Sequence, residues 1–225
     1  MAHFEFLSRP RRMSMRPVLS LAVVVICISL ASGPLIADDE LPRLRELARP
    51  FFTIGVGVDV GIADRSEDRE LLSSQFESVT PENCMKPAPI QSEQGVFRFE
   101  QADQFVQFAE EHEMQIVGHC LVLANTGTPE WFFQDGDGEA SADLLLQRMQ
   151  THIETVVGRY KGRITSWDVV NEALADGSGE YLRDSEWSRI SGEEFIVQAF
   201  AAAHAADPDA LLIYNDYRCE TEEKG

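Results

Sequence analysis

One stretch of the sequence carries a side chain that could move a proton. The run SWDVVNEAL, residues 166–174, places the carboxylate of Glu172 directly after the amide of Asn171, at the end of an apolar stretch rich in β-branched residues. In a regular strand, Asp168 would point to the same face as Glu172, and Asn171 to the opposite face. The segment favours acid–base chemistry at Glu172. The alternative is a structural, salt-bridged glutamate at a strand end.

Three other predicted strands carry polar side chains at or near their carboxyl ends. These are the segments TPEN (80–83), GHC (118–120) and NDY (215–217). A polar residue that closes a strand is usually only a turn former. In a parallel α/β sheet, however, the carboxyl ends of the strands meet, and catalytic groups gather there. Four such endings therefore predict one shared site.

The order of predicted elements supports that sheet. Strands are expected to start near residues 54, 78, 115, 164 and 211, and helical periodicity covers 65–76, 100–112 and 142–160. Ser191 with Glu194 forms a predicted capping box for a further helix that ends before Pro208. Strands that alternate with helices indicate βαβ units and a parallel sheet. We expect a single domain.

The amino terminus has the layout of a secretory signal peptide. Residues 18–30 are apolar, four arginines precede them and the small and turn residues ASGP follow. We expect residues 1–37 to be removed and a secreted, extracellular or periplasmic protein of residues 38–225 to remain, without a membrane segment. The alternative is an uncleaved amphipathic anchor.

Charge and cysteine usage exclude several classes of protein. Removing residues 1–37 takes away four arginines and one glutamate, which leaves 15 basic and 37 acidic side chains. Such a surface repels phosphate backbones and argues against nucleic-acid binding. The remaining cysteines, Cys84, Cys120 and Cys219, fit neither a disulfide framework nor a zinc site. We interpret them as small buried hydrophobic residues and expect no metal.

The motifs together resemble a known enzyme family. WDVVNEA, with VTPENCMK and GHCLV upstream and NDY downstream, looks like the N-terminal part of glycoside hydrolase family 10, over about residues 50–220. That family consists of endo-1,4-β-xylanases on a (β/α)8 TIM barrel. The resemblance implies a secreted retaining glycosidase that acts on xylan or xylo-oligosaccharides, which are β-1,4-linked, and that needs no cofactor.

The resemblance also implies a role for each motif residue. Glu172 matches the acid/base that protonates the glycosidic oxygen, and Asn171 matches the amide that hydrogen-bonds the sugar 2-hydroxyl in the −1 subsite. Glu82, Asn83 and Lys86 match positions that grip the sugar on the glycone side. His119 matches a histidine that contacts the −1 sugar. Taken alone, His119 would be read as a core histidine.

The sequence departs from the family pattern around the predicted sugar site. Leu123 and Ala124 stand where the family has tryptophan and histidine, and Pro87 stands where it has another tryptophan. The segment NTGTPEWF carries one extra residue before PEWF. Leucine offers no flat face for a sugar. We expect weaker or altered sugar binding on the same fold, or a preference for another β-linked glycan.

The second carboxylate of a retaining glycosidase is not assigned in this sequence. Retention needs a nucleophile about 5–5.5 Å from the acid/base, and the resemblance places it roughly a hundred residues beyond Glu172. The printed sequence continues for 53 residues after Glu172. We expect about five β/α units of a truncated (β/α)8 barrel, without the nucleophile. The alternative function is a non-catalytic or degenerate carbohydrate-binding barrel fragment.

Overall fold

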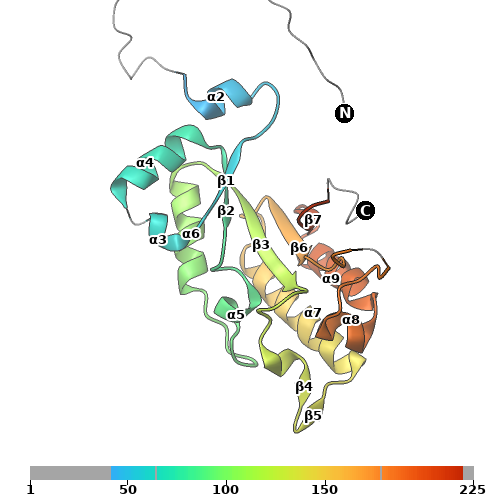
Figure 1. Ribbon diagram of the computed structural model, residues 1–225. Coiled ribbons are helices and arrows are strands. Elements are labelled where there is room, and N and C mark those ends of the chain that lie inside the picture. The colour runs from blue at the N-terminus through green and yellow to red at the C-terminus, as the bar shows by residue number, and fades with distance from the viewer. Residues whose placement is uncertain (1–41, 64, 178, 220–225) are drawn as a thin grey trace, which may run out of the picture. The chain divides into compact units, whose positions relative to one another are not determined.

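The computed structural model describes residues 42–63, 65–177 and 179–219 (Figure 1). Residues 43–225 cluster as one compact unit. The predicted signal peptide, residues 1–37, lies outside the described residues. No helix in the described part of the chain is both long enough and apolar enough to span a membrane.

Five parallel strands form the main sheet, as the sequence predicts. They are β1 (Gly55–Val58), β2 (Ser78–Pro81), β3 (Gln115–Leu123), β6 (Ser166–Asn171) and β7 (Leu211–Asn215). Their order in the sheet is β1-β2-β3-β6-β7, so each new strand pairs with the one before it. This is the arrangement of successive β/α units in a barrel wall, in which each strand adds beside the last. Within the described residues the sheet is open, with β1 and β7 at its edges.

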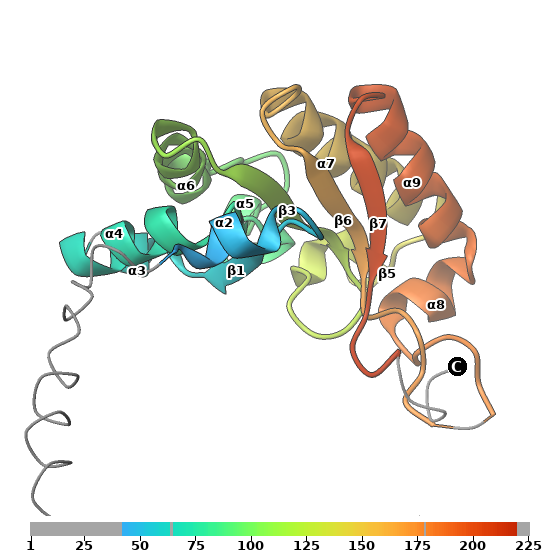
Figure 2. The same cartoon turned by 90° about the horizontal axis from the view of Figure 1, so that it is seen from above.

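Helices follow the strands, and the longer ones were predictable from their periodicity. Their bounds are α2 Leu44–Ala48, α3 Val60–Ala63, α4 Ser66–Gln75, α5 Pro87–Ile90, α6 Glu100–Glu111, α7 Ala142–Arg159, α8 Glu186–Ser191 and α9 Glu194–Ala206. Seen from above, α6, α7 and α9 lie along one side of β3, β6 and β7 (Figure 2). A short 3-10 helix η2 (Glu130–Phe132) and a hairpin of β4 (Gln134–Asp135) and β5 (Gly138–Glu139) follow β3.

The core lies between the sheet and these helices. All six residues of β6 are buried, as expected for a central strand of a parallel sheet covered by helices. Trp167 of β6 is fully buried and lies against Gly118 of β3. A Cβ atom at Gly118 would lie 2.2 Å from Cε3 of Trp167, so only glycine fits there. The glycine of the GHC motif is therefore required for the packing of β3, which carries His119, against β6, which ends directly before Glu172.

The predicted capping box at Ser191 is wrong. Ser191 is the last residue of α8, and its hydroxyl donates to the carbonyl of Trp187 at 2.8 Å. Gly192, with φ of 62°, turns the chain in the left-handed region and separates α8 from α9. The side-chain cap lies at Ser185 instead, which accepts from the backbone N–H of Ser188 at 3.3 Å and begins α8. The serine-rich segment thus forms two helices where periodicity suggested one.

The cysteine prediction holds for two of the three positions. Cys84 and Cys120 are buried and free, whereas Cys219 is exposed, so its expected burial is wrong. Cys219 follows β7 at the edge of the sheet, where a turn places its side chain in solvent.

Candidate active site

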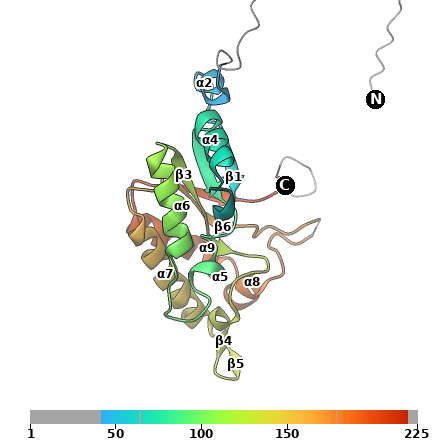
Figure 3. The same cartoon turned by 90° about the vertical axis from the view of Figure 1, so that its left-hand side faces the viewer.

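The carboxyl ends of the strands meet at the end of the unit that carries α5, α8 and the β4–β5 hairpin (Figures 1 and 3). One cavity of about 740 Å³ opens at the strands and collects side chains from all five of them or from the turns that follow. Glu82, Asn83, Lys86 and His119 all line it, and these are four of the six predicted site residues. Asp168 and Asn215 line it as well. The TPEN, GH and NDY segments therefore line one cavity together.

The turn after β2 is organised by hydrogen bonds between its own polar groups. The Nζ of Lys86 donates to Oδ1 of Asn83 at 3.1 Å, and Nδ2 of Asn83 donates to Oδ1 of Asp59 at 2.8 Å. Glu82 and Asn83 are exposed to the cavity side, and Glu82 continues the strand by donating its backbone N–H to Val58 at 3.0 Å. A cation, an amide and a carboxylate thus stand side by side, a set that can both donate to and accept from sugar hydroxyls.

His119 is oriented by a carboxylate on the neighbouring strand. Its Nδ1 lies 2.8 Å from Oδ2 of Asp168, and the two residues are register partners in β3 and β6. This contact fixes the imidazole ring and leaves Nε2 for the cavity. Cys120, the next residue, lies on the buried side, where burial raises the pKa of its thiol to about 12. The cysteine is therefore a neutral packing group.

The regular alternation expected for β6 is wrong. The register shifts on both sides of β6 between Asp168 and Val170: β6 has one residue more than β7 over this stretch, and β3 has one residue more than β6 between His119 and Val122. A bulge of this kind inserts one residue and reverses which side chains face which way beyond it. Asn171 accordingly points to the same side as Asp168, because its Oδ1 accepts from Nδ2 of Asn215 at 2.8 Å and Asn215 lines the cavity.

Glu172 adopts a backbone conformation that is rare for a glutamate. Its φ is 59°, in the left-handed region. Its backbone N–H still donates to the carbonyl of Asn215 at 2.9 Å, so the residue remains attached to β7 while the chain turns. Non-glycine residues in this region persist where the surrounding structure fixes them, and such positions concentrate at functional sites.

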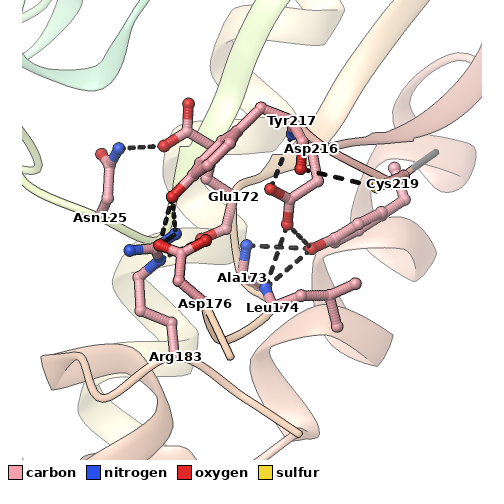
Figure 4. A network of polar contacts seen from close by, with 10 residues as sticks. Asn125, Glu172, Ala173, Leu174, Asp176, Arg183, Asp216, Tyr217 and Cys219 are labelled. Carbon is pink, nitrogen blue, oxygen red and sulfur yellow. Dashed lines mark hydrogen bonds and ion pairs between the residues drawn. The ribbon is translucent and has the colours of Figure 1, made fainter. Parts of the chain in front are cut away.

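Arg183 supplies much of that fixation (Figure 4). Its Nε donates to the carbonyl of Glu172 at 2.9 Å, and its Nη2 donates to Asp176 at 3.0 Å and to the hydroxyl of Tyr217 at 2.9 Å. Its backbone N–H donates to Ala173 at 2.8 Å. One side chain thus ties the Glu172 turn to the loop that follows it and to the segment after β7.

Hydrogen bonds of the Tyr214 hydroxyl hold the residues directly after Glu172. The hydroxyl of Tyr214 accepts from the backbone N–H groups of Ala173 and Leu174, both at 3.0 Å, and donates to Oδ2 of Asp216 at 2.6 Å. Burial, followed by the bond to Asp216, raises the pKa of Tyr214, so the phenol stays protonated and keeps donating. The NDY motif therefore helps to hold the turn that carries Glu172.

The family departures after GH lie outside the cavity lining. Leu123 and Ala124 are buried, and the carbonyl of Leu123 accepts from Nε1 of Trp187 at 3.1 Å. Pro87 is also buried, at the first position of α5. Asn125 is the residue that the sequence did not single out: its Nδ2 donates to Oε2 of Glu172 (Figure 4). In the sequence, the only signal for Asn125 is that it directly follows Leu123 and Ala124, the two departures from the family pattern.

The two remaining predicted residues, Asn171 and Glu172, do not line this cavity. Asn171 is joined to its lining by the hydrogen bond from Asn215, and Glu172, the next residue in the chain, accepts a hydrogen bond from Asn125. Arg183 and Asp168 were not predicted as site residues. Among the described residues there is no group of three or more histidine, cysteine or acidic side chains able to hold a metal ion.

A parallel sheet in which each strand pairs with the one before it, with polar groups at the carboxyl ends of the strands, is the arrangement found in the wall of a β/α barrel. The family model for Glycosyl hydrolase family 10 matches residues 43–225. This chain belongs to glycosyl hydrolase family 10.

Curated relatives and solved structures agree with that assignment. Endo-1,4-beta-xylanase of Geobacillus stearothermophilus is 44% identical over 82% of this chain and 56% of its own length. The crystal structure of xylanase XynB from Paenibacillus barcinonensis, complexed with a conduramine derivative, is 43% identical, covers 80% of this chain and 54% of that one, and has a TM-score of 0.75. The complex of an intracellular xylanase from Thermoanaerobacterium saccharolyticum with xylotetraose is 40% identical, covers 80% and 58% of the two chains, and has a TM-score of 0.74.

The chain spans only part of these proteins. It covers 29% of Endo-1,4-beta-xylanase A of Caldicellulosiruptor sp. and 17% of that of Thermotoga maritima, and about half of the shorter relatives. No carboxylate among the described residues is assigned as a nucleophile.

The contacts of Arg183 predict that replacing it destabilises the fold more than replacing a surface arginine does. Arg183→Met keeps the apolar stem and removes three hydrogen bonds, one of them to the Glu172 carbonyl. We expect it to lower the free energy of unfolding by about 1–2 kcal/mol in urea denaturation, since partly buried hydrogen bonds of a charged group are lost. The matched control is Arg163→Met, which breaks a more exposed pair with Glu110 and should cost less than about 0.5 kcal/mol. Equal costs for the two variants would contradict the anchoring role.

Proposed function

We propose that this chain provides the glycone-binding and acid/base part of a retaining endo-1,4-β-xylanase that acts on xylan or xylo-oligosaccharides. Glu172 is the acid/base. Glu82, Asn83, Lys86 and His119 bind the sugar on the glycone side, and Asn171 binds the sugar next to the scissile bond. The observation that carries the proposal is the convergence of four predicted sugar-binding side chains on one cavity, with Asn171 hydrogen-bonded to Asn215 of its lining and followed in the chain by Glu172.

The hydrogen-bond pattern of Asn171 suits the role proposed for it. Its Oδ1 is occupied by Nδ2 of Asn215, which fixes which way the amide lies. Its Nδ2 makes no hydrogen bond to the described residues, so this group is left to donate to a sugar 2-hydroxyl. In glycosidases a bond to that hydroxyl strengthens as the transition state forms.

The chemistry proposed for Glu172 is proton transfer to and from oxygen. As a carboxylic acid it protonates the glycosidic oxygen while the bond to the anomeric carbon breaks, and as a carboxylate it later takes a proton from water. The covalent step between these two transfers needs a second carboxylate. The proposal concerns the acid/base half of the centre and leaves the nucleophile unassigned.

The acidic composition supports a neutral substrate. Across the printed sequence there are 38 acidic and 19 basic residues, which makes binding of polyanions unfavourable. A polymer of uncharged sugars carries no such penalty, and its hydroxyls match the donors and acceptors of the cavity.

Calorimetric titration with xylotetraose tests the sugar-binding part of the proposal. We expect the folded chain to release binding heat, and Lys86→Met to weaken the affinity at least about tenfold, because hydrogen bonds to a charged group contribute roughly 1.5–3 kcal/mol. Lys161→Met is the control, since Lys161 does not line the cavity and its Nζ instead donates to the carbonyl of Ala206, the last residue of α9. Absence of heat from a folded sample, or equal affinities in the two variants, would overturn the proposal.

A non-catalytic carbohydrate-binding role is the second candidate, and Leu123 and Ala124 favour it. These residues stand where the resemblance leads one to expect an aromatic wall and a histidine, and both are buried away from the cavity. Chromatography of the titrated xylotetraose separates the two functions. Shorter xylo-oligosaccharides in the sample support the glycosidase, and intact ligand after tight binding supports the binding role.

Export is the remaining part of the proposal. Its support is the arginine-rich start, the apolar run of residues 18–30 and the following ASGP segment. We expect N-terminal sequencing of the protein recovered outside the cytoplasm to find a start close to residue 38. Protein that stays in the cytoplasm with residues 1–37 attached would contradict this part and leave the sugar chemistry unaffected.

A further inference from the structure

The carboxylate of Glu172 has two oxygens in different surroundings. Nδ2 of Asn125 donates to Oε2, whereas Oε1 makes no hydrogen bond to the described residues. In Figure 4 the second oxygen points away from Asn125. A proton that is to be transferred must sit on an oxygen that is not already occupied by a donor.

We propose that Asn125 is a positioning residue that occupies Oε2 of Glu172 and thereby directs the transferable proton to Oε1. This inference rests on the proposed function of Glu172 as acid/base. It assigns to Asn125 the task of orienting the carboxyl group, in a loop where the expected tryptophan and histidine are replaced by Leu123 and Ala124.

The loop that carries Asn125 is held on both sides of the residue. The backbone N–H of Ala124 donates to the carbonyl of Asn171 at 2.9 Å, which extends the pairing of β3 with β6 up to Asn125. On the other side, the hydroxyl of Thr128 donates to the carbonyl of Leu123 at 2.9 Å and closes the turn. Gly127, with φ of 119°, allows this turn and lies against the side chain of Leu123.

The amide of Asn125 depends on Glu172 for its orientation. Its Oδ1 is buried and has no hydrogen-bond partner among the described residues. The contact with Glu172 is therefore the only hydrogen bond that holds this side chain within the described part of the chain. A change in the ionisation of Glu172 must therefore change the hydrogen bond made by the side-chain amide of Asn125.

The proton balance of the two transfers follows from this contact. In the acid form the O–H of Glu172 lies on Oε1. This proton passes to the glycosidic oxygen as that oxygen takes the bonding pair of the broken C–O bond, and the second carboxylate that retention requires bonds to the anomeric carbon in its place. The Glu172 carboxylate that remains keeps the N–H donor of Asn125 on Oε2. A water molecule then gives a proton to Oε1 while its oxygen replaces the second carboxylate on the anomeric carbon, which restores the acid and frees that carboxylate.

Other charged groups lie around this part of the site. Asp168 of β6, Lys86 after β2 and Glu172 itself all act electrostatically on the thiol of Cys120 in β3. On the opposite side, Arg183 holds the Glu172 carbonyl and is paired with Asp176 and Tyr217. Asn125 differs from all of these because it contacts the carboxylate itself.

NMR titration of the full chain tests the inference without requiring turnover. The probes are the carboxyl carbon of Glu172 and the side-chain amide of Asn125. In the wild type we expect both probes to report one shared titration, and in Glu172→Gln we expect the Asn125 amide to become insensitive to that pH range. An amide that never follows the Glu172 titration would overturn the inference.

Two variants separate positioning from a merely structural role. Asn125→Ala removes the donor, and Asn125→Asp keeps the shape but substitutes a like charge, so Glu172 should hold its proton to higher pH in both and to the highest pH in Asn125→Asp. Xylotetraose affinity should stay within about twofold of wild type in Asn125→Ala, because the glycone cavity does not include Asn125. Unchanged Glu172 titration in both variants would overturn the inference.

The two proposals fail in different ways. If xylotetraose does not bind but the Asn125 amide follows Glu172, the sugar-binding function fails while the contact stands. If xylotetraose binds and the amide does not respond, the positioning role of Asn125 fails while the function stands.

Discussion

The left-handed turn at Glu172 is the constraint on which the rest of the site depends. A glutamate in this conformation is unfavourable by itself, and tertiary contacts must compensate for it. Here the backbone N–H is paired with Asn215 of β7, the carbonyl with Arg183, and the following two N–H groups with Tyr214. The turn therefore exists only because β7 and the loop after β6 are both in place.

The bulge in β6 has a related consequence. It brings Asn171 to the cavity side together with Asp168, although a regular strand would separate them. Asp168 can then orient His119 at 2.8 Å, while the side-chain oxygen of Asn171 accepts from Nδ2 of Asn215. The register irregularities of β3 and β6 thus place Asp168 and Asn171 on the same side of the sheet.

Much of the fold followed from the sequence because its signals were local. Each strand is a short run rich in β-branched residues, and the polar residues at four strand ends share one edge because parallel strands end together. The glycoside hydrolase resemblance rested on those same residues. Sequence periodicity does not report contacts between distant segments. It therefore could not predict the bulge, the end of α8 at Ser191 or the hydrogen bond from Arg183 to the Glu172 carbonyl. Asn125 was missed for the same reason, since it meets Glu172 across 47 positions.

A crystal structure of this chain with xylotetraose would test the central claim most directly. The account predicts sugars in the cavity lined by Glu82, Asn83, Lys86 and His119, with a 2-hydroxyl on Nδ2 of Asn171 and a glycosidic or terminal oxygen within hydrogen-bond reach of Oε1 of Glu172. Oε2 should remain on Asn125. Ligand bound elsewhere on the chain, or bound in the cavity with Glu172 turned away from every sugar oxygen, would contradict it.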